Sequence, residues 1–151
     1  MKTIKVNIKS ESEMIKVGFK LGQLAYPNMV IAMNGNLGAG KTTLTKGIGQ
    51  ALGIKRVINS PTFTIMKIYE GSMNLYHLDV YRINNSSTDF DLEEYFYLGG
   101  VSVIEWAENI EDLLPKETLY LDYIIEADTS RTISFTGEDE FIEKLVIKLG
   151  E

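Results

Sequence analysis

The chain has 151 residues, of which 44% are hydrophobic and 24% charged, and this profile predicts one globular domain over residues 1–151 with a sizeable core. The formal net charge is −6, which argues against unaided binding of nucleic acid, because neutralising phosphates dominates such binding. There is no cysteine to form disulfides or thiolate metal sites, no apolar run as long as a membrane span and no apolar leader after Met1, so we expect a cytoplasmic protein that does not engage a membrane.

The first half of the chain predicts a strand, a helix, a buried strand and a second helix. Residues 3–8 alternate with period two, which is typical of a half-exposed strand. Ser10 or Ser12 can cap the next helix, and Ser10 with Glu13 has the spacing of a capping box. Residues 29–33 are a short apolar run, as a buried strand should be, and residues 43–52 predict a helix.

Between that buried strand and that helix lies Gly35-Asn36-Leu37-Gly38-Ala39-Gly40-Lys41-Thr42, which fits the phosphate-binding pattern G-x-x-x-x-G-K-[ST]. The glycines allow the backbone N–H groups to approach an anion, and the following helix adds its positive N-terminal end. Lys41 is placed to reach the β- and γ-phosphates of a nucleotide, and the Thr42 hydroxyl is placed to bind Mg²⁺. A plain glycine-rich turn is the alternative, and the flanking strand and helix make it the weaker one.

The second half predicts a hairpin followed by alternating strands and helices. The hairpin has strands at 63–69 and 73–80 and follows a loop at 54–62; beyond it we expect helices at 89–97, 107–113 and 138–149 and strands at 101–104, 118–126 and 131–136. This order predicts an α/β fold, a P-loop NTPase-like three-layer sandwich with a mixed, mainly parallel central sheet. The phosphate site is then expected at the carboxyl ends of the parallel strands.

A phosphate loop needs an acidic residue for its magnesium, and two carboxylates follow apolar strands. Asp79 follows residues 75–78 and Glu105 follows residues 101–104. Either carboxylate can equally be a surface charge at a strand end. We favour Glu105 because its strand is more continuously apolar.

Other single residues leave alternatives open. His77, the only histidine, is more typical of a packed, hydrogen-bonded residue than of a catalyst. Ser60-Pro61-Thr62 is a turn or a loop that senses the γ-phosphate. Arg82 and Arg131 either pair with an anion or lie on the surface. The chain has no Asn-Lys-x-Asp stretch, which many GTPases use to read guanine, so ATP is favoured over GTP.

Four segments in this order resemble the bacterial TsaE (YjeE) ATPases, which take part in making threonylcarbamoyladenosine in tRNA. The segments are GNLGAGKTT (35–43), SPTF (60–63), YHLDVYR (76–82) and IEW (104–106), and the resemblance covers most of residues 10–136. It implies a P-loop domain that hydrolyses ATP weakly alone, and it implies a TsaD–TsaB complex as partner. TsaD transfers the threonylcarbamoyl group, and ATP hydrolysis here resets the complex. Contact with tRNA is then indirect, through that complex.

The resemblance also implies roles for individual residues. Lys41 holds the phosphates, Thr42 binds Mg²⁺, and Glu105 is the acidic partner of Mg²⁺ directly or through water. Asp79 lies beside the γ-phosphate and helps to orient the metal or the attacking water. The remaining implied nucleotide contacts are Asn36, Leu37, Gly38, Ala39, Gly40, Thr43, Ser60, Thr62, Trp106, Ser10 or Glu11, and Arg131.

The sequence departs from the family pattern at Asn36, where the family commonly has Asp, and we expect a modest effect on nucleotide affinity. Residues 91–99 match the family only loosely. Two other classes of function stay open beside the ATPase accessory protein. One is a small-molecule or nucleoside kinase, disfavoured by the lack of an Arg-rich lid, and the other is a nucleotide-binding regulatory module without useful turnover.

Overall fold

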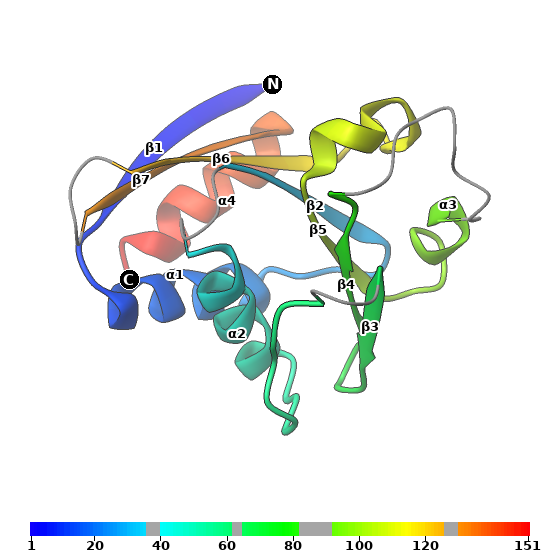
Figure 1. The fold of residues 1–151 in the computed structure, drawn as a ribbon. Helices are drawn as coiled ribbons and strands as arrows, with labels where there is room; N and C mark the ends of the chain where they lie inside the picture. Colours follow the sequence, from blue (N-terminus) through cyan, green and yellow to red (C-terminus); the bar gives the residue numbers. More distant parts are fainter. Residues whose placement is uncertain (36–39, 62–64, 82–91, 126–129) are drawn as a thin grey trace.

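A computed structural model gives the fold and describes residues 1–35, 40–61, 65–81, 92–125 and 130–151. The elements alternate along the chain between strands and helices (Figure 1). They are β1 (Lys2–Ile8), α1 (Glu11–Gln23), β2 (Met29–Asn34), α2 (Lys41–Ala51), β3 (Met66–Tyr69), β4 (Leu75–Asp79), α3 (Leu92–Tyr95), β5 (Val101–Glu105), the 3₁₀ helix η1 (Ala107–Leu113), β6 (Leu119–Ile125), β7 (Arg131–Gly137) and α4 (Asp139–Leu149).

Within the described ranges, seven strands form one sheet in the order β1-β7-β6-β2-β5-β4-β3. The central strand β2 pairs in parallel with β5 and β6, and β5 pairs in parallel with β4. The β1–β7, β6–β7 and β3–β4 pairs are antiparallel. Strands β1, β6, β2, β5 and β4 therefore run in one direction and only β7 and β3 oppose them, which confirms a mixed, mainly parallel sheet.

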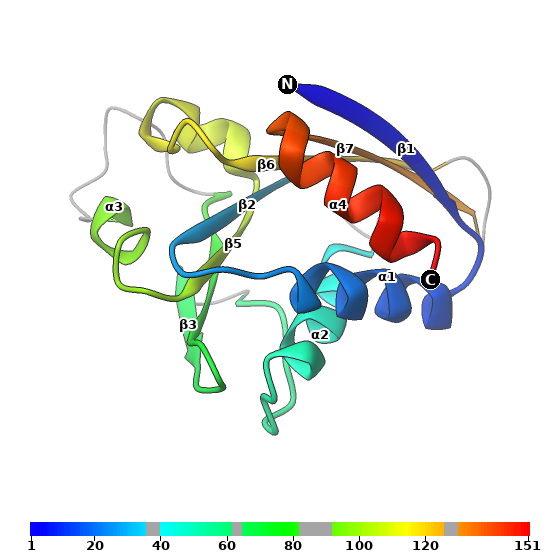
Figure 2. The same cartoon turned by 180° about the vertical axis from the view of Figure 1, so that it is seen from behind.

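Alternate side chains of β2 enter two different cores, one on each face of the sheet. Met29, Ile31 and Met33 join the larger core, to which α1, α2 and α4 contribute Leu21, Leu44, Ile48, Ile142 and Leu145. Val30 and Ala32 join the smaller core, which is covered by α3 and η1. Figure 2 shows α1, α2 and α4 together on one side, with α3 and η1 on the other. The three-layer arrangement is thus confirmed over the central strands.

Several elements differ in length or type from those predicted. The hairpin is confirmed, but its described strands are only 66–69 and 75–79. The second strand ends at Asp79 because its carboxylate Oδ1 accepts the N–H of Tyr81 at 3.0 Å, which turns the backbone. The helix predicted over 89–97 is described only as 92–95. The helix at 107–113 is a 3₁₀ helix kinked at Ile110. Among the helices that the structure describes, none has both the length and the apolar character needed to cross a membrane.

Candidate functional site

The backbone at both described ends of the glycine-rich loop adopts conformations that favour glycine. Gly35 follows β2 with φ of 149°, and Gly40 precedes α2 with φ of 97°. A Cβ on Gly40 would lie 2.9 Å from Cε of Met14, and a Cβ on Gly35 would lie 2.7 Å from Cβ of Tyr123. The positive φ disfavours larger residues at both positions, and at Gly35 the fixed Cβ of Tyr123 also leaves no space for one. Asn36, Leu37, Gly38 and Ala39 lie outside the described residues.

The N-terminus of α2 has no side chain that caps it. Its N-cap is Gly40, and the first turn, which includes Thr42 and Thr43, contains no acidic residue. The first backbone N–H groups of an α-helix have no partner within the helix, and they carry its partial positive charge. This helix end is suited to an anion, as the sequence pattern predicts.

Lys41 is almost entirely buried, with 4% of its surface exposed. Its Nζ donates a hydrogen bond to the carbonyl of Gly35 at 3.0 Å and lies 4.5 Å from the ring centroid of Trp106. Trp106 adopts a left-handed backbone conformation with φ of 61°, and its ring lies 4.8 Å from that of Tyr81. The loop lysine and the only tryptophan, which are 65 positions apart in sequence, therefore meet at one place.

Asp79 and Glu105 lie side by side at the carboxyl edge of the sheet. They are register partners of each other, and Glu105 is also the partner of Met33 on β2. Every second residue of a strand points to the same face, so Asp79 shares a face with Leu75, and Glu105 shares one with Val101 and Val103. These three apolar residues belong to the core that α2 covers. Both carboxylates consequently project from the sheet face on which α2 begins. The fold thus brings Lys41, Asp79 and Glu105 to one edge.

Glu105 is 5% exposed, and its carboxylate is held by a buried histidine. The distance from His77 Nε2 to Glu105 Oε2 is 2.6 Å, and His77 is completely buried. His77 Nδ1 has no hydrogen-bond partner among the residues that the structure describes. The sequence alone indicated a packed, hydrogen-bonded histidine, but did not identify its partner. The available signal for a place near the carboxylates was period-two alternation, since it puts His77 on the same face of the strand as Asp79.

Tyr123 also borders this site and was not predicted to do so. Its hydroxyl donates to the sulfur of Met33 at 3.9 Å, and its Cβ lies close to Gly35. Burial raises the pKa of Tyr123 well above its usual value of 10.0, and the negative charge of Glu105 raises it further. Tyr123 thus lies next to Gly35 and Met33, and its hydroxyl keeps its proton at neutral pH.

The residues predicted from the first helix and the late strand lie where β1 ends and β7 begins. Ile8 is the register partner of Arg131, which brings the start of α1 next to β7. The hydroxyl of Ser10 accepts the N–H of Glu13 at 3.1 Å and thereby caps α1, as the capping-box spacing predicts. Arg131 Nη1 donates to the carbonyl of Ser130 at 3.1 Å. Glu11 lies in the first turn of α1, and its side chain is exposed.

The sensor loop is described only in part. Ser60 is half-buried and Pro61 is buried, whereas Thr62 lies outside the described residues. Arg82 lies outside them as well. The predicted roles of Ser60 and Thr62 in contacting a nucleotide therefore stay predictions.

The donor atoms at this edge suit a hard cation that arrives with phosphates. The described residues contain no group of three or more His, Asp or Glu side chains that could hold a metal by themselves. Mg²⁺ in phosphate-loop proteins is bound by one or two carboxylates together with substrate phosphates, so a full protein cage is not required. The Thr42 hydroxyl and the Glu105 carboxylate are oxygen donors of the kind that Mg²⁺ prefers.

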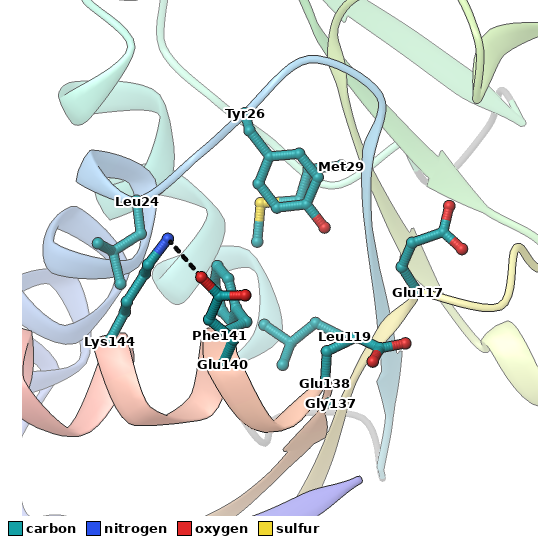
Figure 3. A pocket seen from close by; sticks show the side chains of 10 residues that line it. All are labelled: Leu24, Tyr26, Met29, Glu117, Leu119, Gly137, Glu138, Glu140, Phe141 and Lys144. Atoms are coloured by element: carbon teal, nitrogen blue, oxygen red, sulfur yellow. Dashed lines mark ion pairs between the residues drawn. The ribbon is translucent and has the colours of Figure 1, made fainter.

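A pocket of about 390 Å³ lies at the opposite edge of the sheet, where β2 and β6 begin (Figure 3). Its apolar lining comes from Leu24, Tyr26, Met29, Leu119 and Phe141, and its charged lining from Glu117, Glu138, Glu140 and Lys144. Lys144 pairs with Glu140 at 3.8 Å. Because β2 begins at this pocket and ends at the glycine-rich loop, the two features are separated by the length of that strand.

Comparisons with a family model, with curated proteins and with solved structures agree on one family. The model of the family described as "Threonylcarbamoyl adenosine biosynthesis protein TsaE" matches residues 8–133. The tRNA threonylcarbamoyladenosine biosynthesis protein TsaE of Bacillus subtilis (strain 168) is 43% identical over 150 residues, covering 99% of this chain and 95% of its own length. The protein of the same name from Treponema pallidum (strain Nichols) is 38% identical over 128 residues, covering 83% of this chain and 95% of its own. The crystal structure of Bacillus subtilis YdiB superposes with a TM-score of 0.84 at 38% identity, covering 99% of this chain and 95% of that one.

Proposed function

The chain belongs to the TsaE family of threonylcarbamoyl adenosine biosynthesis proteins, and from this premise we propose that it binds and hydrolyses ATP in support of that tRNA modification. It does not transfer the threonylcarbamoyl group itself. It acts through a TsaD–TsaB complex, which makes the contacts with tRNA. The acidity of the chain supports this division of labour, because a net charge of −6 disfavours direct contact with tRNA phosphates.

One observation carries the proposal of ATP hydrolysis: Lys41, Asp79 and Glu105 converge at the carboxyl ends of β2, β4 and β5, on the face where α2 begins. A phosphate loop with a lysine, a hydroxyl and an acidic residue at a neighbouring strand end is the arrangement that nucleotide hydrolysis requires. Both the charge of Lys41 and the open helix end favour binding of phosphates there.

Each residue has a distinct task in this proposal. Lys41 leaves its bond to the Gly35 carbonyl to bind the β- and γ-phosphates, while Trp106 bounds the site beside it. Thr42 and Glu105 would hold Mg²⁺, directly or through water, and the bound cation would neutralise charge on the phosphate oxygens. Asp79 orients the attacking water or the metal. The backbone N–H groups of the loop complete the cradle.

A small-molecule or nucleoside kinase on the same scaffold is the alternative function. It would need a second binding site for the phosphate acceptor next to Lys41. The pocket that Figure 3 shows is at the other end of β2 and therefore cannot serve as that acceptor site.

The deciding experiment is reconstituted tRNA modification with and without this chain, comparing one round per TsaD–TsaB complex with many rounds. We expect the first round to proceed in both reactions and the later rounds to require this chain and ATP hydrolysis. Released phosphate, measured in parallel, should rise strongly when the complex is added.

Other outcomes would contradict the proposal in different ways. Equal modification over many rounds without the chain would remove its role in the cycle. Transfer of labelled γ-phosphate to an added metabolite would support the kinase. Binding of ATP without turnover under every condition would leave a regulatory module.

A further inference from the structure

The histidine that contacts Glu105 occupies a place where an apolar residue would be expected. His77 lies in the middle of β4, and its neighbours on the same sheet face include Leu75 on its own strand and Val101 and Val103 on β5, all of which belong to the larger hydrophobic core. The same face also carries Lys67, its register partner on β3, and Asp79 at the end of β4. Burying an imidazole completely costs free energy unless its two ring nitrogens are hydrogen-bonded.

The hydrogen bonds of His77 are incomplete in a way that points to Glu105. A carboxylate can only accept, so the contact of 2.6 Å requires that Nε2 carries the proton. Nδ1 then has no partner in any described range of the chain. The single described hydrogen bond of this buried ring is therefore the one to Oε2 of Glu105. A buried polar atom that is left unpaired calls for an explanation other than stability.

Among the described residues, only one of the two oxygens of the Glu105 carboxylate has a hydrogen-bond partner. His77 is the register partner of Val103, so it reaches Glu105 diagonally, two residues along the neighbouring strand. It occupies Oε2, while no described residue forms a hydrogen bond with Oε1. A rigid ring fixed by the core thus fixes the direction of the remaining oxygen.

We propose that His77 is a positioning residue, whose Nε2–H holds the Glu105 carboxylate in the orientation that serves the metal accompanying the nucleotide phosphates. Removing a residue that hydrogen-bonds a metal ligand typically lowers metal affinity or activity about 10-fold to 100-fold. The inference rests on the proposed function, because it takes Glu105 as the acidic partner of Mg²⁺.

The test uses the full chain with a non-hydrolysable ATP analogue and Mn²⁺, whose binding is followed by electron paramagnetic resonance. His77→Met fills the space without a donor, whereas His77→Gln keeps an N–H at about the reach of Nε2. We expect His77→Met to raise the half-saturating Mn²⁺ concentration about 10-fold or more, and His77→Gln to restore it to within about 3-fold of wild type. Affinity for the analogue in EDTA should change less than about 2-fold, because the phosphate cradle is intact.

Ser102→Ala is the matched control for a general effect on the core. Ser102 lies on β5, its hydroxyl is buried without a partner in the described structure, and it faces the opposite core from His77. We expect this variant to bind Mn²⁺ as wild type does. Thermal unfolding of every variant checks the fold, and if His77→Met does not fold, His77→Asn replaces it, since its shorter amide cannot reach Oε2.

A double-variant cycle with Glu105→Gln separates positioning from other effects. If His77 acts through Glu105, His77→Met should add little to the loss already caused by Glu105→Gln. Wild-type Mn²⁺ binding by His77→Met, equal losses in His77→Met and His77→Gln, or fully additive losses would each overturn the role of His77. Wild-type Mn²⁺ binding by Glu105→Gln would instead overturn the metal assignment in the proposed function, and the role of His77 with it.

Discussion

The Glu105 side chain is buried, whereas most glutamates in folded proteins are exposed. It is 5% exposed, and its described partner is an imidazole rather than an arginine or lysine. Burying a carboxylate is costly, and such costs are found where a charge is needed for binding or chemistry. Asp79 next to it is half-buried and already accepts a backbone N–H. These environments favour Glu105 over Asp79 as the residue reserved for a metal.

Two single substitutions test the division of tasks at this edge. We expect Lys41→Ala and Glu105→Ala each to reduce ATP turnover about 100-fold or more, because each removes charge stabilisation of the transferring phosphoryl group. Glu105→Ala should spare ATP binding more than Lys41→Ala does, since the cradle of N–H groups and the lysine remain. Phosphate release and nucleotide titration measure the two effects.

Matched controls for these two variants lie on α4, away from the site. Lys144 and Glu143 are exposed side chains of that helix, so Lys144→Ala and Glu143→Ala should behave as wild type. Turnover by Glu105→Ala at the wild-type rate in the partner complex would show that the metal-ligand assignment is wrong.

At the scale of elements, the position of α2 depends on how closely α1 can approach it. A Cβ on Gly18 of α1 would lie 2.1 Å from the carbonyl oxygen of Leu44, and a Cβ on Gly47 of α2 would lie 2.1 Å from that of Ile15. Backbone atoms cannot yield as a flexible side chain can. The two glycines therefore let the helices touch through their backbones, and this contact fixes the helix whose N-terminus borders the proposed phosphate site.

Gly47→Ala tests this contact. Glycine to alanine normally stabilises a helix by about 1 kcal/mol, but here we expect a loss of about 1–3 kcal/mol in the free energy of unfolding, because the added methyl group overpacks the crossing. Urea denaturation followed by circular dichroism measures the change.

Gly150→Ala provides the control, since the nearest atoms to its added Cβ are 3.6 Å away and its φ of −81° suits any residue. It should change the free energy of unfolding by less than about 0.5 kcal/mol. A stabilised Gly47→Ala variant would mean that the two helices can separate without cost.

At the scale of the whole molecule, the buried hydroxyl of Tyr123 links the site to stability at alkaline pH. Burial, followed by the charge of Glu105, raises the pKa of Tyr123 in the folded chain well above 10.0. In the unfolded chain the same tyrosine loses its proton near pH 10. Below that pH both states are protonated, so the group contributes no pH dependence. Above it, the unfolded chain alone is ionised, and the free energy of unfolding falls as pH rises.

Tyr123→Phe should therefore make the alkaline loss of stability shallower. One proton difference corresponds to about 1.4 kcal/mol per pH unit, which is the largest decrease in slope that this substitution can cause. Urea denaturation at pH 9, 10 and 11 measures it. Tyr26 and Tyr120 also have raised pKa values, mainly through burial, so a residual slope is expected. An unchanged slope would show that Tyr123 ionises in the folded chain.

The sequence by itself determined the features that depend on neighbouring residues. The spacing of Gly35, Gly40 and Lys41 between an apolar strand and a helix predicted the phosphate loop, and two strand-like runs on either side of a short polar turn at 70–72 predicted the hairpin. The cap at Ser10 followed from its spacing to Glu13, and its geometry confirms it. The strands that bring Asp79 and Glu105 to the sheet edge were predicted over 73–80 and 101–104, because apolar runs beside a carboxylate are visible in the sequence, and the structure places their ends at Asp79 and Glu105.

Only the tertiary structure decided which of these residues meet, because strand order and register depend on packing between distant segments. Placing β5 between β2 and β4 made Glu105 the neighbour of both Met33 and Asp79. The same register gave His77 its partner, carried Trp106 to Lys41 and put Tyr123 against Gly35. No periodicity in the chain encodes these contacts, since each joins residues at least 26 positions apart, brought together by burial of two cores on one sheet.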